Sequence, residues 1–164
     1  MLAAAIALFT KMPVARNYEA EVERAKTEQR STTGALVGSW VMTDESRSHL
    51  TIASRGGHGK ITLKQTGEFL SDGFPSDLLY SMPGMRSAPP VTGNGTWKLR
   101  ELDGEPAVWL SFEAIAGPTE LEVPTGTPLL ISGHGHRLTL YAFPDDPDQG
   151  KRIEFEKVDW NAAR

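Results

Sequence analysis

The sequence contains no cysteine. This absence excludes disulfide bonds, thiolate metal ligands, a cysteine nucleophile and a lipid attached to an N-terminal cysteine. It does not decide the cellular compartment, because exported proteins without disulfides are common.

Clusters of positive charge are also missing. The 17 Lys and Arg residues are outnumbered by 21 Asp and Glu residues, which gives a formal net charge of −4 and a pI of about 5.6. Sequence-independent binding to nucleic acid depends on neutralising phosphates with Lys and Arg. We therefore expect no nucleic-acid partner.

A long hydrophobic run is the third absence. The apolar N-terminal run covers only Leu2 to Phe9, whereas a membrane-spanning helix needs about twenty apolar residues. No Lys or Arg precedes the run, as one would in a complete signal peptide. Two interpretations stay open. The run is the end of a longer signal or anchor, which favours an extracytoplasmic or membrane-anchored protein that contacts the membrane through residues 1–12. Otherwise it is a helix that packs on the domain or a partner, which is compatible with the cytoplasm.

The next segment, Asn17 to Arg30, has the composition of a helix. It contains good helix formers and no Gly or Pro, and Glu19, Glu23 and Lys26 follow helical spacing. Its apolar side is too thin to bury much surface. It predicts a solvated helical linker or, alternatively, a stalk that holds the domain off a membrane. We assign residues 1–33 to an N-terminal apolar segment and helical linker, and residues 159–164 to a C-terminal tail.

Residues 34–158 consist mainly of short alternating apolar runs separated by turns. The 16 Gly and 11 Pro of the chain favour many turns over long helices. Alternation predicts strands at 36–43, 60–64, 68–71, 93–101, 107–114, 127–132, 137–143 and 152–158. Residues 45–53 are ambiguous, as a further strand or a wrapped loop.

Eight or nine strands with short links indicate an all-β, antiparallel fold. The simplest topology is an up-and-down barrel of about eight strands with an N-terminal helical extension, because closure removes the exposed edges. A two-sheet sandwich is the alternative. The proline-rich stretch 74–91 cannot be a central strand, and its length casts doubt on a simple meander there. Within it, Ser76 to Tyr80 predicts a helical turn capped by Ser76.

Two Gly-x-Trp motifs carry a family resemblance. Gly38 to Trp40 opens the first strand, and Gly95 to Trp97 repeats the motif. The first motif resembles that of the lipocalin and calycin barrels. The resemblance implies that Trp40 closes one barrel end beside Gly38 and that a basic residue of the last strand, Arg152 or Lys157, covers its ring. Alternatively, Trp97 holds that position.

The run LTLYAFPDDPDQGKRIEFEKV is also similar to that of a small group of bacterial lipocalin-like proteins. Together with the first motif, the resemblance covers most of residues 34–158. No activity follows from it.

Chemistry-bearing motifs are weak. His134 and His136, with His58, could bind zinc, but the glycines around them favour an exposed turn. The aspartates of Asp145 to Asp148 lack the spacing of a calcium loop, and no nucleophile elbow or phosphate loop is present. We expect no catalytic residue, metal or cofactor, and no enzyme.

Two functions remain. The first is a non-enzymatic, lipocalin-like binding module that holds a small apolar ligand. The second is a filled-core structural or protein-interaction domain at the bacterial envelope, with the 74–91 loop as its partner surface. The residues expected to line a ligand site are Leu78, Leu79, Tyr80, Trp97, Trp109, Phe112 and Tyr141. Inward orientation of Trp40, Trp97, Trp109 and Phe112 together would indicate a filled interior and disfavour the first function.

Overall fold

A computed structural model describes residue 23 and residues 32–79, 88–116, 125–134, 137–144 and 147–158. The chain divides into two units, 1–33 and 34–164. The predicted apolar segment, the helical linker apart from Glu23, and the tail therefore lie outside the described residues. Within the described parts, no helix is both long enough and apolar enough to cross a membrane.

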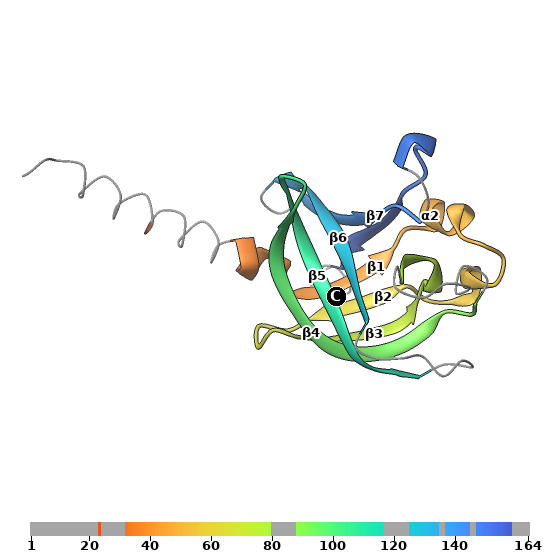
Figure 1. Ribbon diagram of the computed structural model, residues 1–164, viewed down its shortest axis with the longest axis horizontal. Coiled ribbons are helices and arrows are strands. Elements are labelled where there is room, and N and C mark those ends of the chain that lie inside the picture. Colours follow the sequence, from red (N-terminus) through yellow and green to blue (C-terminus); the bar gives the residue numbers. More distant parts are fainter. Residues whose placement is uncertain are drawn as a thin grey trace, which may run out of the picture. The chain divides into compact units, whose positions relative to one another are not determined.

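Eight antiparallel strands form a closed barrel in chain order (Figure 1). Each strand pairs with the next, and the last pairs back with the first, with Trp40 opposite Lys157. The closed order confirms the barrel and excludes the sandwich. The strands are β1 (Gly38–Met42), β2 (Lys60–Leu63), β3 (Glu68–Phe74), β4 (Val91–Leu102), β5 (Glu105–Ala116), β6 (Thr125–His134), β7 (Arg137–Ala142) and β8 (Ile153–Lys157).

The proline-rich stretch leaves the meander intact. Strands β3 and β4 pair directly, with one irregularity between Ser71 and Phe74. A short 3-10 helix, η2 (Ser76–Leu78), follows Pro75, which is its N-cap residue and makes no side-chain cap bond. The predicted Ser76 cap is therefore wrong, because the Ser76 hydroxyl donates to the carbonyl of Ala88 at 2.6 Å.

Residues 45–53 form neither a strand nor a plain loop. They contain all but the first residue of the helix α2 (Asp44–His49), and the 3-10 helix η1 (Ser54–Gly56) follows. The Thr43 hydroxyl accepts a hydrogen bond from the Ser46 amide at 3.2 Å, and acidic residues occupy the first turn. Both features stabilise a helix N-terminus. Residues 32–36 are also helical, so the first strand begins at Gly38 rather than at residue 36.

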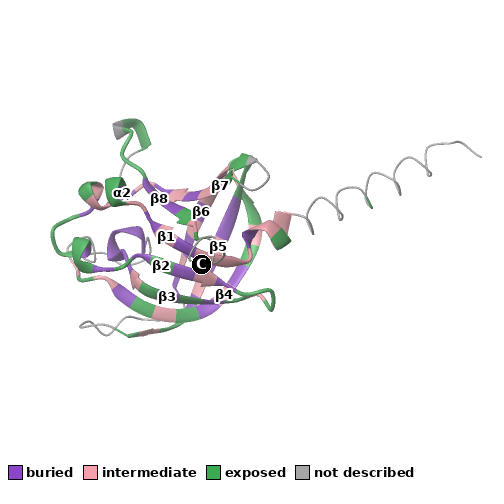
Figure 2. Cartoon of the chain, turned by 180° about the vertical axis from the view of Figure 1, so that it is seen from behind, coloured by how far each residue is buried: buried purple, intermediate pink, exposed green. Residues whose placement is uncertain are grey.

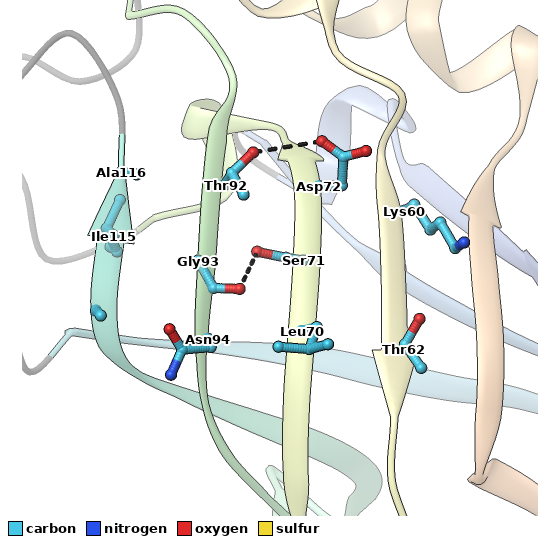
Figure 3. A pocket seen from close by; sticks show the side chains of 11 residues that line it. Lys60, Thr62, Leu70, Ser71, Asp72, Thr92, Gly93, Asn94, Ile115 and Ala116 are labelled. Atoms are coloured by element: carbon cyan, nitrogen blue, oxygen red, sulfur yellow. Dashed lines mark hydrogen bonds between the residues drawn. The ribbon is translucent and has the colours of Figure 1, made fainter.

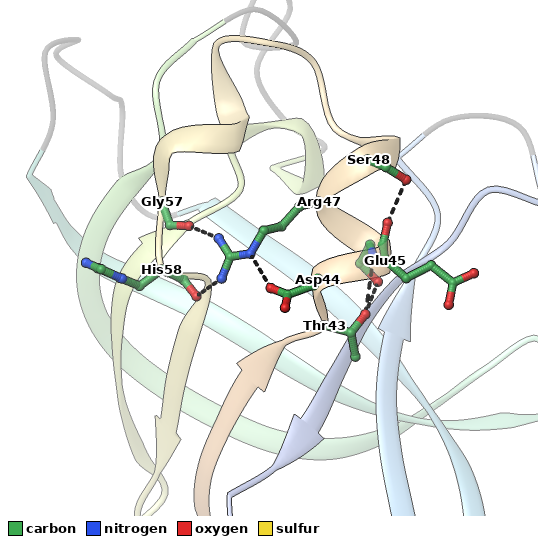
Figure 4. Close-up of polar contacts among 8 residues, drawn as sticks. Thr43, Asp44, Glu45, Arg47, Ser48, Gly57 and His58 are labelled. Atoms are coloured by element: carbon green, nitrogen blue, oxygen red, sulfur yellow. Dashed lines mark hydrogen bonds and ion pairs between the residues drawn. The ribbon is translucent and has the colours of Figure 1, made fainter.

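Arg47 ties α2 to the segment that leads into β2 (Figure 4). Its guanidinium donates to the carbonyl of Gly57 at 2.5 Å and to that of His58 at 3.2 Å. The same group is 3.3 Å from the carboxylate of Asp44. These bonds hold the segment between η1 and β2 against α2.

Large side chains fill the barrel interior, and buried and exposed positions alternate along the strands (Figure 2). Phe69 meets Phe112 edge-on with ring centroids 4.9 Å apart. Phe74 lies 5.5 Å from Phe112 and 6.0 Å from Phe155. All four rings are fully buried. They form one chain of aromatic contacts within the core.

Candidate functional site

Trp40 lies in β1, near the barrel end at which this strand begins. Its side chain is fully buried, and its indole N–H donates to the carbonyl of Leu36 at 2.9 Å. The ammonium of Lys157 lies 5.8 Å from the centre of the indole ring and donates to the carbonyl of Ala35 at 2.5 Å. Trp40 and Lys157 therefore hold the last carbonyls of the helical residues 32–36 against the barrel.

Glycine is required beside this pair. Gly38 has a φ of +137°, and a Cβ there would lie 2.9 Å from Cε of Lys157. Arg152, the other basic residue proposed to cover Trp40, instead lies over the ring of Tyr141 at 5.3 Å and pairs with Glu154.

Trp97, the alternative to Trp40, is also buried but occupies a different place. Its indole N–H donates to the carbonyl of Lys64 at 2.9 Å, and its backbone amide donates to the carbonyl of Gly67. Trp97 therefore anchors the turn between β2 and β3.

The 3-10 helix η2 follows β3 at the opposite barrel end, and its apolar side chains are buried. Leu78 and Leu79 are 0% and 3% exposed, and Thr127 donates to the carbonyl of Leu78 at 2.6 Å. The buried carboxylate of Asp77 accepts hydrogen bonds from the Thr51 amide at 2.9 Å and the Ser54 hydroxyl at 2.8 Å. The apolar residues expected on an exposed loop thus belong, as far as they are described, to the core. Tyr80 lies outside the described residues.

The residues expected to line a ligand site do not all lie on one side of the barrel wall. Trp97 and Phe112 join Leu78 and Leu79 in the core. Trp109 alternates with buried Val108 and Leu110, so it lies on the outer face of β5, and Tyr141 lies on the outer face of β7 for the same reason. Of the four residues whose inward orientation would indicate a filled interior, Trp109 alone points outward. That criterion for a filled interior is therefore met in part, and four phenylalanine rings in mutual contact lie in the core.

A groove of about 510 Å³ lies over the outer face of β2 to β5 (Figure 3). The outward side chains form two rows across the strands. The first row runs through Lys60, Asp72, Thr92 and Ala116, and the second through Thr62, Leu70, Asn94 and Ala114.

Glycines in β4 allow the curvature of this region. A Cβ on Gly93 would lie 2.7 Å from the carbonyl oxygen of Ala114, and one on Gly95 would collide with that of Ser111. The register between β4 and β5 shifts between Asn94 and Gly95. Such bulges bend a strand and increase its twist, and Figure 1 shows β4 and β5 as long, curved strands.

The groove combines an apolar floor with separated charges. Leu70 is 48% exposed and shares the lining with Ala114 and Ile115, which lie two strands away on β5. The carboxylate of Asp72 accepts from the Thr92 hydroxyl at 3.3 Å. Lys60 lies opposite Asp72 in the register, yet its amine points away from that carboxylate (Figure 3). Sequence reasoning missed this site. The one available signal was an outward leucine, Leu70, near a glycine-rich strand.

The described residues contain no group of three or more His, Asp or Glu side chains that could hold a metal ion. His136 and the aspartates at 145 and 146 lie outside them, as does the side chain of His134. Apart from His58 and Asp148, the side chains weighed above as zinc or calcium ligands therefore lie outside the described residues, and the expectation that they hold no metal stays a prediction.

The observed class is a closed, eight-stranded, up-and-down antiparallel barrel, which is compatible with a lipocalin-like fold. No family model, curated protein or solved structure matches the chain.

Proposed function

We propose that this protein is a non-enzymatic, lipocalin-like binding module whose ligand lies in the outer groove over β2 to β5 instead of the barrel interior. The observation that supports this site is the groove of about 510 Å³ with a half-exposed leucine, Leu70, on its floor. Small-molecule sites typically have volumes of about 300–1,000 Å³ and combine apolar walls with a few polar groups.

Occupied interior space favours an outer site. An eight-stranded barrel has room either for its own side chains or for one small ligand. Here the rings of Phe69, Phe74, Phe112 and Phe155 are in contact within the interior. A ligand in the interior would have to displace them and expose the apolar surface that they bury.

The two rows of the groove suggest the class of ligand. Leu70 and Ala114 present apolar surface in one row, while Lys60 and Asp72 present charge in the other. Lys60 makes no ion pair within the described residues, so its ammonium is available to an anionic group. The ligand is therefore a small molecule with an apolar body and an anionic end near Lys60.

Methyl NMR tests the location with a defined probe, 1-anilinonaphthalene-8-sulfonate, which joins an apolar ring system to a sulfonate. We expect saturable binding that shifts the methyl signals of Leu70 and Ala114, while those of the buried Leu110 and Leu129 stay in place. Shifts concentrated on the core leucines would place the site in the interior and overturn the proposal.

Variants test the roles of the lining. Leu70→Asp should weaken binding of the probe at least tenfold, while Val158→Asp is the matched control, because Val158 is similarly exposed at 43% and is not among the lining residues. Lys60→Gln should weaken the sulfonate probe but leave its uncharged analogue, N-phenyl-1-naphthylamine, unaffected. Equal binding by wild type and Leu70→Asp would contradict the proposal.

A further inference from the structure

The outer face of β5 to β7 carries a second surface, separate from the groove. We call it the outer stripe and define it as Trp109, Pro128, Leu130, Tyr141 and Phe143. Each of these side chains is half-buried. Their strands hold them together: Trp109 is opposite Pro128, and Leu130 is opposite Tyr141. Tyr141 meets Phe143 edge-on at 5.7 Å.

The Trp109 ring packs close to the backbone of Gly126, which leaves no room for a side chain there. A Cβ on Gly126 would lie 2.7 Å from the indole nitrogen of Trp109 and 3.1–3.2 Å from two ring carbons. On the ring lies the guanidinium of Arg100, 5.3 Å from the ring centre. Arg100 is thereby held against the outer face of the sheet. Such stacking leaves guanidinium N–H groups free for hydrogen bonds to a planar carboxylate.

Positive charge around Trp109 lacks a partner in the described parts of the chain. Arg100 makes no ion pair there, and neither does Lys98, which is the cross-strand neighbour of Trp109. Two carboxylates lie diagonally from these cations on adjacent strands. Glu68 is bound by Lys64 and Thr66, and the exposed Glu105 makes no ion pair. The neighbours of Trp109 on β6 carry no charge.

We propose that the outer stripe, with Arg100 and Lys98 at its β4 end, docks an acidic segment of a partner protein that places a carboxylate on Arg100 and an apolar side chain on the stripe. Aromatic residues and arginine dominate the binding energy of protein interfaces. At the far end of the stripe, Arg152 is already paired with Glu154. The acidic group of the partner is therefore expected at the Arg100 end.

Base stacking by a nucleic acid fits this surface less well. Gly126 and Arg100 already contact the Trp109 ring, and Arg152 and Phe143 contact that of Tyr141. A stacked base would have to displace one of these groups. The net charge of −4 also opposes binding to phosphate backbones.

Fluorescence polarisation on the full chain tests the proposal. The probe is a short fluorescein-labelled peptide that combines glutamate with leucine, and its matched control has glutamine at each glutamate. We expect saturable binding of the acidic peptide and at least tenfold weaker binding of the amide peptide. Equal binding of the two peptides, or binding of neither, would overturn the proposal.

Variants separate the stripe from the rest of the surface. Arg100→Gln and Trp109→Ala should each weaken the acidic peptide at least tenfold. Arg100→Lys should also weaken it, since lysine keeps the charge but loses the planar fork. Lys151→Gln, at an exposed position beyond the stripe, should have no effect. Unchanged binding by Arg100→Gln would refute the assignment, and far-ultraviolet circular dichroism checks that each variant is folded.

Other occupants give distinct results. If phosphatidylserine vesicles bind the protein and the Trp109→Ala variant abolishes that binding, the stripe is a membrane surface and the proposal fails. Sedimentation that shows a dimer lost in Trp109→Ala would assign the stripe to a second copy, with the same consequence. The Leu70→Asp variant should bind the acidic peptide as the wild type does. A negative result for ligand binding in the groove can therefore be distinguished from a negative result for peptide binding at the outer stripe.

Discussion

Truncation of Trp40 tests how this barrel is held closed. The side chain is fully buried, lies under the ammonium of Lys157 and donates its indole N–H to the carbonyl of Leu36 at 2.9 Å. Trp40→Ala removes the ring, leaves that carbonyl without its donor and deprives Lys157 of the aromatic face.

The expected cost follows from these contacts. Truncation of a buried aromatic side chain to alanine costs about 3–5 kcal/mol, and a buried acceptor that loses its donor adds to this cost. We expect the upper part of the range, about 4–5 kcal/mol. A domain of this kind has a total stability of about 5–15 kcal/mol, so the variant should be near the limit of folding.

Guanidinium denaturation followed by far-ultraviolet circular dichroism measures the change without relying on tryptophan fluorescence. Trp40→Phe keeps a ring and loses the N–H donor, so it should retain the fold and cost less than Trp40→Ala. Lys157→Met should cost about 0.5–2 kcal/mol, because the stem stays while the cation over the ring is lost. The matched control is Trp109→Ala on the outer face, with an expected loss of about 1 kcal/mol. If Trp40→Ala remains within about 1 kcal/mol of wild type, outside the range for buried aromatic residues, the closure argument is refuted.

Three further predictions concern other parts of the molecule. Leu78→Ala should cost about 2–5 kcal/mol in the same assay, since Leu78 plugs the barrel end, and a loss no larger than that of Leu70→Ala would contradict this role. Deletion of residues 1–30 should leave a protein that unfolds cooperatively. Deletion of residues 1–36 also removes the buried Leu36 and should lower the denaturation midpoint. Equal midpoints for the two deletions would show that residues 32–36 do not stabilise the barrel. The pKa of Glu68 should lie below its ordinary value, first because the Thr66 hydroxyl donates to the carboxylate and second because of the Lys64 charge. The stabilisation from the ionised form is then present at neutral pH and lost as the pH falls through the folded-state pKa, and carboxyl NMR titration of Thr66→Val should show a raised pKa, with an unchanged value counting against the hydrogen bond.

Alternation made most of the barrel predictable from sequence. Each strand that faces the core on one side alternates buried and exposed residues, and all eight predicted strands correspond to strands of the barrel. The turn between β4 and β5 also has a recognisable sequence signal. Asp103 and Gly104 adopt φ values of 52° and 86°, and Asp-Gly is favoured where a two-residue turn needs positive φ at both positions.

Local capping explains why residues 45–53, predicted as a strand or a wrapped loop, form most of a helix instead. Thr43 and the acidic first turn form a helix start, while the apolar residues that follow gave a competing signal for extended chain. Long-range contacts could not be predicted from the sequence pattern either. The choice of Lys157 over Arg152 as the cation on Trp40 depends on the register of β8 against β1, which alternation alone does not fix.

The surfaces formed by outward side chains could not be predicted for a more general reason. Inward side chains share a common environment, so their apolar character identifies them, whereas an outward residue acquires meaning only from its neighbours on adjacent strands. Leu70 gains significance from Ala114 two strands away, and Trp109 from Arg100 and Gly126. The same reasoning separates binding from stability here. The buried apolar side chains form one core cluster inside the barrel. Substitutions of outward residues in the groove and the outer stripe should therefore alter binding while the barrel remains folded. The two surfaces can thus be tested separately.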